Sequence, residues 1–277
     1  MTSKAFSPAN ISCIFRIYRH KNPRWMGSYG IGFTINEGVV VEADEAKKNT
    51  VLFNGKKISF PAVESVINRL TKEKIRVHIR TKLPLGCGFG LSGASALATA
   101  YSLNDLLKLG KTKKELAIVA HTADAENKTG LGDVVNQYYG GFCLKLKPSS
   151  YFEIVSLPIN NIDVYCRHFS GISTKSVITN MKIKEKINDA ASCSLNEVRK
   201  LLKNRKSIQF RDIIQISKQF ALNSSLLKDK KTMEAIKAIE NNDGNASMIM
   251  LGNAVFSDIP FEMSSKFRIS NEGAHLL

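Results

Sequence analysis

The chain has 277 residues, of which 43% are hydrophobic and 8% aromatic, as is typical of a globular protein with a sizeable core. Its five cysteines include no Cys-x-x-Cys pair, which argues against a disulfide framework or a zinc site and favours buried thiols in a reducing compartment. The formal net charge of +16 leaves nucleic-acid binding open as an alternative function.

The first half of the chain is expected to be rich in strands. Alternating apolar residues predict strands over residues 3–17, 30–42 and 74–80, with a hairpin over 51–60 and a helix over 61–72 between the last two. Alanines and leucines then predict a helix over 94–107. The capping box Thr112-Lys-Lys-Glu115 begins another helix, and a strand is expected over 141–147.

A domain boundary is expected at the Pro-Ser-Ser sequence of residues 148–150, which divides the chain into domains 1–150 and 151–277. Beyond it, strands are predicted over 152–157 and 163–169, and helices over 176–188, 194–204, 208–226 and 229–241. Runs of strands and runs of helices, rather than regular βαβ alternation, indicate the α+β class.

Residues 84–94 form the most informative segment, because a glycine-rich sequence lies there between a predicted strand and a predicted helix. The segment reads Pro-Leu-Gly-Cys-Gly-Phe-Gly-Leu-Ser-Gly-Ala. Glycines let the backbone approach a ligand closely, and the free N–H groups and dipole of a helix N-terminus favour an anion. The sequence therefore predicts a phosphate-binding loop.

Other interpretations of this loop stay open. Residues 88–93 match the dinucleotide fingerprint G-x-G-x-x-G, although the region about 20 residues further on reads as helix rather than as a strand ending in an acid. Residues 90–94 resemble a nucleophile elbow in which Ala94 replaces the last glycine. A tight turn for close strand–helix packing is the simplest alternative, and a P-loop is excluded because no Gly-Lys-Ser/Thr follows.

The loop also resembles the motif Pro-x-Gly-x-Gly-x-Gly-x-Ser-x-Ala of the GHMP kinase superfamily, which includes galactokinase, homoserine kinase and mevalonate kinase. The resemblance implies a two-domain α+β fold with the active-site cleft between the domains, the first being the ATP-binding domain. It implies ATP and Mg²⁺ as cofactors, with Ser92 at the metal, although Leu91 stands where the family usually has a second serine. The residues implied to bind ATP are Pro84, Gly86, Gly88, Gly90, Ser92, Gly93 and Ala94.

A second segment, residues 123–141, resembles the Glu … Gly-x-x-Asp … Gly-Gly sequence of the same superfamily. The resemblance implies that Glu126 helps to bind Mg²⁺ and that Asp133 is the catalytic carboxylate, acting on the acceptor hydroxyl as a base or as a positioning group. Phosphoryl transfer needs both functions, and hard carboxylate oxygens suit Mg²⁺. The alternatives are a helix N-cap for Asp133 and a solvated helix face for Glu126.

Four further segments are similar to archaeal pantoate kinases. They are the Ser7-Pro8 start, after which Ala9 and Asn10 replace the expected Gly and His, the glycine-rich residues 27–32, residues 171–175, and Leu251-Gly-Asn253 in place of the superfamily's third glycine-rich motif. The resemblance implies pantoate as the acceptor and a role in coenzyme A synthesis, with homoserine, mevalonate or a sugar as alternative acceptors. The pantoate carboxylate needs a cation. The candidate substrate residues are Asn10, Arg24, Ser28 and Lys175, with Arg16 as a further cation.

Location and partners follow from charge and hydropathy. The uncharged residues 83–104 contain four glycines and a proline, so we expect no membrane span, and no secretory signal is evident, so we expect a cytoplasmic protein. The basic residues fall on predicted amphipathic helices without interleaved aromatic strands, so we expect no nucleic-acid partner. A homodimer is a further expectation.

Overall fold

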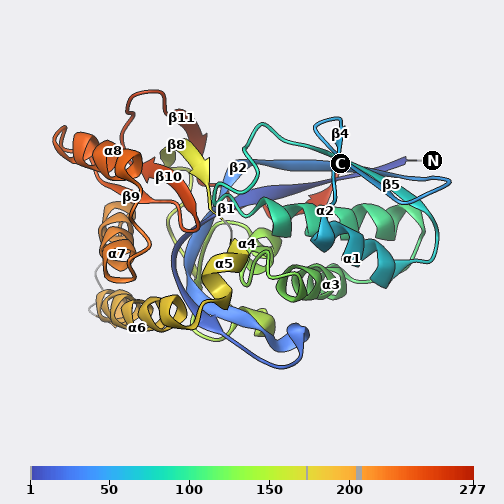
Figure 1. Ribbon diagram of the computed structural model, residues 1–277, viewed down its shortest axis with the longest axis horizontal. Helices are drawn as coiled ribbons and strands as arrows, with labels where there is room; N and C mark the ends of the chain where they lie inside the picture. The colour runs from blue at the N-terminus through green and yellow to red at the C-terminus, as the bar shows by residue number, and fades with distance from the viewer. Residues whose placement is uncertain (1, 173, 204–207) are drawn as a thin grey trace.

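The computed structural model describes residues 2–172, 174–203 and 208–277, and these residues form two sheets with helices packed on both (Figure 1). The larger sheet has eight strands, and the smaller has four. Two long antiparallel strands, β1 (Thr2–Tyr18) and β2 (Gly27–Glu45), run through the larger sheet. The mixture of strands and helices confirms the α+β prediction.

Both long strands extend beyond the predicted ranges, and glycines of β2 pack directly on the backbone of β1. A Cβ atom added at Gly38 would meet the Cα atom of Pro8 at 2.8 Å, and one added at Gly32 would meet the carbonyl oxygen of Ile11 at 2.7 Å. The register shifts between Pro8 and Asn10, so the strand bends there and continues. The remaining strands of this sheet are β3 (Thr50–Phe53), β4 (Lys56–Lys57), β5 (Ile75–Arg80), β6 (Phe142–Lys145), β7 (Val155–Leu157) and β12 (His275–Leu276).

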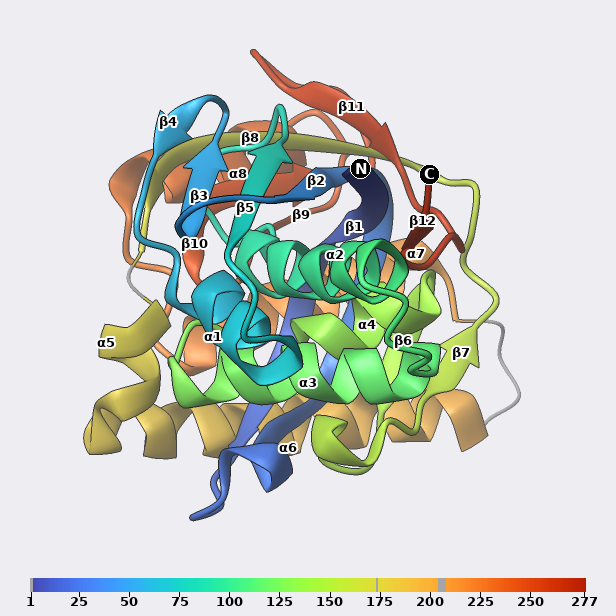
Figure 2. The ribbon, with the colours of Figure 1, turned by 90° about the vertical axis from the view of Figure 1, so that its right-hand side faces the viewer.

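A layer of helices lies against one face of this sheet (Figure 2). The central helix, α2 (Leu91–Leu106), contacts both long strands, and its alanines Ala94, Ala96, Ala98 and Ala100 are fully buried. Small side chains let a helix approach a sheet closely, which explains why this helix is apolar on all sides rather than amphipathic. The other helices of the layer are α1 (Pro61–Leu70), α3 (Lys113–Glu126) and α4 (Asp133–Tyr139).

The smaller sheet and the remaining helices come from the second half of the chain. Its strand order is β11-β8-β10-β9, and α6 and α7 pack on each other and on β1. The elements are β8 (Asp163–Gly171), β9 (Ala246–Met248), β10 (Gly252–Ser257), β11 (Ser265–Arg268), α5 (Thr174–Thr179), α6 (Met181–Lys203), α7 (Phe210–Asn223) and α8 (Lys230–Glu240). Two single-turn 3₁₀ helices are η1 (Pro23–Trp25) and η2 (Ser149–Tyr151).

The structure differs from the sequence predictions in two places. The helices predicted over 176–188 and 194–204 are the short α5 and one long α6, because Ile187, Ala191 and Leu195 continue a single buried face. The predicted end at residue 204 lies outside the described residues. The strand predicted over 152–157 is shortened to β7, since η2 and a left-handed Phe152 precede it.

The division at residue 150 stays a prediction. The larger sheet takes β7 and β12 from beyond that residue, and β12 pairs with β1. Among the described residues, no helix is long and apolar enough to cross a bilayer. All five cysteines are free thiols; four are buried as expected, whereas Cys193 is exposed on α6.

Acid is expected to destabilise the protein through His121 on α3. Its Nε2 atom lies 2.8 Å from the carbonyl oxygen of Met26, and burial lowers the pKa of the imidazole from 6.5 to about 4. The unfolded chain therefore binds a proton in a pH range where the folded chain does not, so stability is lost as the pH falls through that range. Between pH 8 and pH 5 the loss is about 2 kcal/mol.

Asp124 opposes this effect, because burial raises the pKa of its carboxyl to about 7 and the folded state then keeps a proton that the unfolded state releases. The measurement must therefore isolate His121. Denaturant titrations of the wild type and His121→Gln at both pH values do so, and the wild type should lose about 2 kcal/mol relative to the variant at the lower pH. Parallel pH dependence of the two proteins would contradict the prediction.

Candidate active site

The glycine loop turns sharply at alternate residues before α2. Gly86, Gly88 and Gly90 have φ angles of +80°, +85° and +63°, which side chains with a Cβ atom rarely adopt. Gly90 is the N-cap residue of α2 and offers no side chain to the first N–H groups of that helix. These groups and the dipole of a 16-residue helix are therefore available to a phosphate.

The segment 249–252, which overlaps the Leu251-Gly-Asn253 sequence, packs against this loop. A Cβ atom at Gly88 would meet Ile249 Cγ2 and the Met250 carbonyl oxygen at 2.8 Å. A Cβ atom at Gly252 would in turn collide with the carbonyl group of Cys87. The second half of the chain thus supports the back of the loop and fixes its path.

Gly88→Ala is expected to be far more disruptive than Gly86→Ala. The two glycines have similar positive φ angles, so both variants share a strain of about 1–2 kcal/mol. Only the alanine at position 88 also collides with segment 249–252, and overpacking adds about 1–3 kcal/mol, whereas the space around Gly86 is open. Denaturant titrations and the KM for ATP measure the difference. Equal losses in the two variants would contradict it.

A cavity of about 450 Å³, here called the site cavity, lies in front of the loop and extends from Phe60 and Leu85 to Ser12 and Asp133. The predicted site residues that line it are Gly86, Gly88, Gly90, Ser92, Asp133, Ser28 and Lys175. Gly93 and Ala94 lie just behind it, buried at the start of α2. The site cavity therefore brings the loop and the predicted catalytic carboxylate together.

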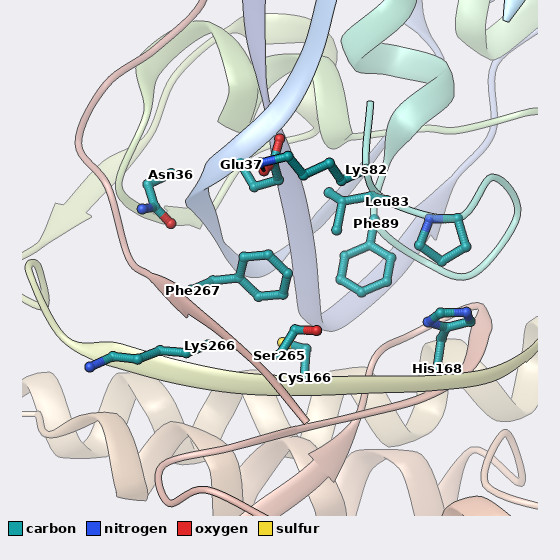
Figure 3. Close-up of a pocket in the computed structure, with 11 residues that line it drawn as sticks. Asn36, Glu37, Lys82, Leu83, Phe89, Cys166, His168, Ser265, Lys266 and Phe267 are labelled. Carbon is teal, nitrogen blue, oxygen red and sulfur yellow. Dashed lines mark ion pairs between the residues drawn. The ribbon is translucent and has the colours of Figure 1, made fainter. Parts of the chain in front are cut away.

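A second cavity of about 350 Å³, here called the rear cavity, lies between the loop, β2, β8 and β11 (Figure 3). Pro84, expected to contact ATP, lines the rear cavity rather than the site cavity. Phe89 lines both and forms part of the wall between them. Phe267 also lines the rear cavity, and the Lys82 ammonium is 3.7 Å from the Glu37 carboxylate. The charges of Lys82 and Glu37 are thus partnered with each other.

Asp133 is the first residue of α4, and its N-cap residue is Gly132, so the alternative role as an N-cap does not describe it. Its Oδ1 atom accepts hydrogen bonds from Asn10 Nδ2 at 2.6 Å and Ser12 Oγ at 3.5 Å. Burial raises the pKa of the Asp133 carboxyl, while the positive charge of Lys145 and these two donors lower it. The donors thus offset the cost of burying this carboxylate.

A second buried carboxylate, Asp124 on α3, was missed by sequence reasoning. Its Oδ1 atom accepts a hydrogen bond from Thr129 Oγ1 at 2.6 Å, and its Oδ2 atom and the Oδ2 atom of Asp133 both lie within 3.0 Å of the place where a Cβ atom at Gly130 would be. Burial first, and then the charge of Asp133, raises the pKa of Asp124 to about 7. The available signal was its position between Ala123 and Ala125 on a helix, where a charged residue is rare unless it has a partner or a function.

Ser92 Oγ is buried without a hydrogen-bond partner in the described structure, yet it lies close enough to Asp124 to lower the pKa of that carboxyl. Because the hydroxyl falls just outside hydrogen-bonding geometry, it remains available to a ligand. Two converging carboxylates and an unpartnered hydroxyl form a donor set of hard oxygens, which is the chemistry that Mg²⁺ prefers. These residues therefore fit the expected metal.

Glu126 occupies a different environment. Its carboxylate accepts hydrogen bonds from Ser65 Oγ and Arg69 Nη2 of α1, and it does not line the site cavity. The partly exposed ion pair with Arg69 matches the alternative of a solvated helix face more closely than a metal ligand. The helix presents Asp124, rather than Glu126, to the loop.

The cations expected to bind the substrate carboxylate also differ in whether they line the site cavity. Arg24 donates to the carbonyl oxygen of Ser150 at 2.9 Å and stacks over Trp25, away from the site cavity. Arg16 stacks over the ring of Tyr29. Lys175, from α5, lines the site cavity and is exposed. A buried lysine, Lys145, lies behind Asp133 and was not predicted.

Comparisons with known proteins cover this site. Residues 57–141 match the family described as GHMP kinases N terminal domain, a range that includes the glycine loop and Asp133. A protein named pantoate kinase from Methanocaldococcus jannaschii is 34% identical, with 91% of this chain and 90% of the relative covered. The pantoate kinase of Methanospirillum hungatei is 30% identical, with 91% and 86% covered.

Solved structures show the same similarity in three dimensions. A structure described as a phosphotransferase related to the CoA biosynthesis pathway has a TM-score of 0.85 and 25% identity, covering 100% of this chain and 98% of its own. Mevalonate diphosphate decarboxylase from Staphylococcus aureus has a TM-score of 0.75 at 14% identity, with 100% and 98% covered, and shares the fold.

Proposed function

The chain belongs to the pantoate kinase family and has the fold of the GHMP kinases, and from this premise we propose that it phosphorylates the primary hydroxyl group of pantoate with ATP. The product, 4-phosphopantoate, would enter coenzyme A biosynthesis. One observation carries the proposal beyond family membership: a single cavity joins the helix N-terminus behind Gly90 to the half-buried Asp133 carboxylate. A phosphate donor and a hydroxyl acceptor can therefore meet there.

The donor side of the reaction is assigned to the loop and the two acids beside it. The backbone N–H groups after Gly90 bind the phosphates, and the apolar end of the site cavity at Phe60 and Leu85 receives the base. We propose Ser92 and Asp124 as the residues that hold Mg²⁺, with Asp124 in place of Glu126. When bound, Mg²⁺ neutralises charge on the phosphates.

The acceptor side is assigned to Asp133 and its neighbours. The Oδ1 atom of Asp133 is occupied by Asn10, so the Oδ2 atom, on the Gly130 side, is left to orient the acceptor hydroxyl and receive its proton. Asn10 is fully buried and acts through Asp133 rather than on the substrate. Ser28 and Lys175 line the site cavity, and Lys175 supplies the cation for the pantoate carboxylate.

Cytoplasmic location belongs to the same proposal and is supported by the five free thiols. An archaeal source is supported by the organisms of the relatives named pantoate kinase. A homodimer stays a prediction, which the molar mass in solution tests by light scattering.

The proposed reaction is tested by identifying its product. Incubation with Mg-ATP and pantoate should give a new phosphomonoester signal in ³¹P NMR, equal in amount to the ADP formed. Formation of ADP with inorganic phosphate, and without a phosphomonoester, would contradict the proposal, because water would then be the acceptor.

A further inference from the structure

Lys145, the last residue of β6, is a buried lysine whose hydrogen-bond partners are both uncharged. It is 4% exposed, and its Nζ atom donates to Asn136 Oδ1 at 2.6 Å and to the Gly132 carbonyl oxygen at 3.5 Å. Burying an ammonium group costs several kcal/mol unless it is well paired, so a lysine in this position needs a reason.

The reason lies in a chain of hydrogen bonds that begins at Lys145 and ends at Asp133. Asn136 Nδ2, on α4, donates to Asn10 Oδ1, on β1, at 2.8 Å. Asn10 Nδ2 then donates to Asp133 Oδ1 at 2.6 Å. Both asparagines are fully buried, so water cannot replace either partner. The neighbouring elements α4 and β6 and the distant strand β1 thus supply one continuous path.

The two ends of this path determine its direction. An ammonium group only donates hydrogen bonds, so Asn136 must present its oxygen to Lys145 and its nitrogen to Asn10. Asn10 must therefore present its nitrogen to Asp133. If either amide were reversed, two acceptor oxygens would face each other in a buried place, at the cost of an unsatisfied polar group.

We propose that Lys145 is a positioning residue for phosphoryl transfer, which acts through Asn136 and Asn10 to hold the Asp133 carboxylate with Oδ1 occupied and Oδ2 directed to the acceptor hydroxyl. The proposal rests on the proposed kinase function and adds to it a residue that does not touch the substrate. Lys145 is separated from the site cavity, whose lining includes Gly132 and Asp133 but not the lysine. Lys145 therefore does not face the substrate, whereas Lys175 lines the site cavity.

The test is Lys145→Met, which keeps the length and apolar stem of the side chain and removes the donor. We expect kcat with pantoate to fall about 10²-fold, because the catalytic carboxylate loses its fixed orientation. KM for pantoate and ATP should stay within about threefold, and the variant should remain folded, because removal of a buried charge compensates in part for the donor that Asn136 Oδ1 loses. Lys147→Met is the matched control, because Lys147 pairs with Glu153 at the surface and should have no effect on kcat.

A double-mutant cycle tests whether Lys145 and Asn136 act through one path of hydrogen bonds or independently. Asn136→Leu should lower kcat by the same factor as Lys145→Met. The double variant should lose no more kcat than either single variant, because all three variants interrupt the same path of hydrogen bonds. If Lys145→Met does not fold, Asn136→Leu alone decides: wild-type kcat in that variant would overturn the proposal.

Three other outcomes would also overturn it. The first is a wild-type kcat in folded Lys145→Met, and the second is losses that multiply in the double variant. The third is a large rise in KM for pantoate with kcat preserved, which would make Lys145 the partner of the substrate carboxylate. Failure of the wild type to phosphorylate pantoate would instead contradict the proposed function, so the two failures are distinguishable.

Discussion

Replacing Asp133 with asparagine is expected to lower kcat for pantoate by about 10³-fold while ATP still binds. The substitution keeps the size of a half-buried side chain that lines the site cavity. It removes the group that orients the acceptor hydroxyl and takes its proton. Only one carboxylate oxygen of Asp133 is committed to Asn10 and Ser12, which leaves the other for the substrate. The measurement is ADP formation at saturating Mg-ATP and pantoate, with nucleotide affinity from calorimetry.

The matched control for this prediction is Asp105→Asn. Asp105 is an acid of α2 that pairs with Lys108 at 3.0 Å on the surface, so its loss should leave kcat unchanged. Retention of most activity by Asp133→Asn, in a folded protein that binds ATP, would show that another group faces the acceptor hydroxyl.

Asp124→Asn is expected to raise the Mg²⁺ concentration needed for half-maximal activity at least about tenfold and to lower kcat about 10²-fold. The argument is geometric. Asp124 Oδ2 converges with Asp133 Oδ2 at Gly130, beside the unpartnered Ser92 hydroxyl, and burial makes an unpaired carboxylate there costly. A divalent cation relieves both the burial and the mutual repulsion.

Glu126→Gln is the comparison that makes this prediction decisive. The Glu126 carboxylate is held by Arg69 and Ser65, so the variant should keep its Mg²⁺ dependence within about threefold of wild type. Titration of activity with MgCl₂ at fixed ATP measures both variants. The reverse result, with Glu126→Gln impaired and Asp124→Asn normal, would restore the assignment made from sequence alone.

The local parts of the site were predictable from the sequence. The glycine loop, the helix after it and Asp133 all lie within short segments whose residue types carry their own structural meaning. The family resemblance then predicted where ATP and the acceptor bind. The structure adds that Gly90 is the N-cap residue and that segment 249–252 supports the loop.

The remaining features could not be predicted from the sequence, because they depend on which way side chains point and on contacts between distant segments. Asp124 and Glu126 are two residues apart, so they point to different sides of α3, and spacing in the sequence does not say which side faces the loop. Lys145 is recognisable only after β6, α4 and β1 have been placed together. The pairing of β12 with β1 is likewise invisible to local pattern.

The most direct test of the central claim is ADP production with Mg-ATP across pantoate, pantothenate, homoserine, mevalonate and galactose. We predict turnover with pantoate and none with the other acceptors, because the relatives similar to this chain over 91% of its length are named pantoate kinase. Turnover with a different acceptor alone would contradict pantoate as the substrate while leaving the kinase chemistry in place.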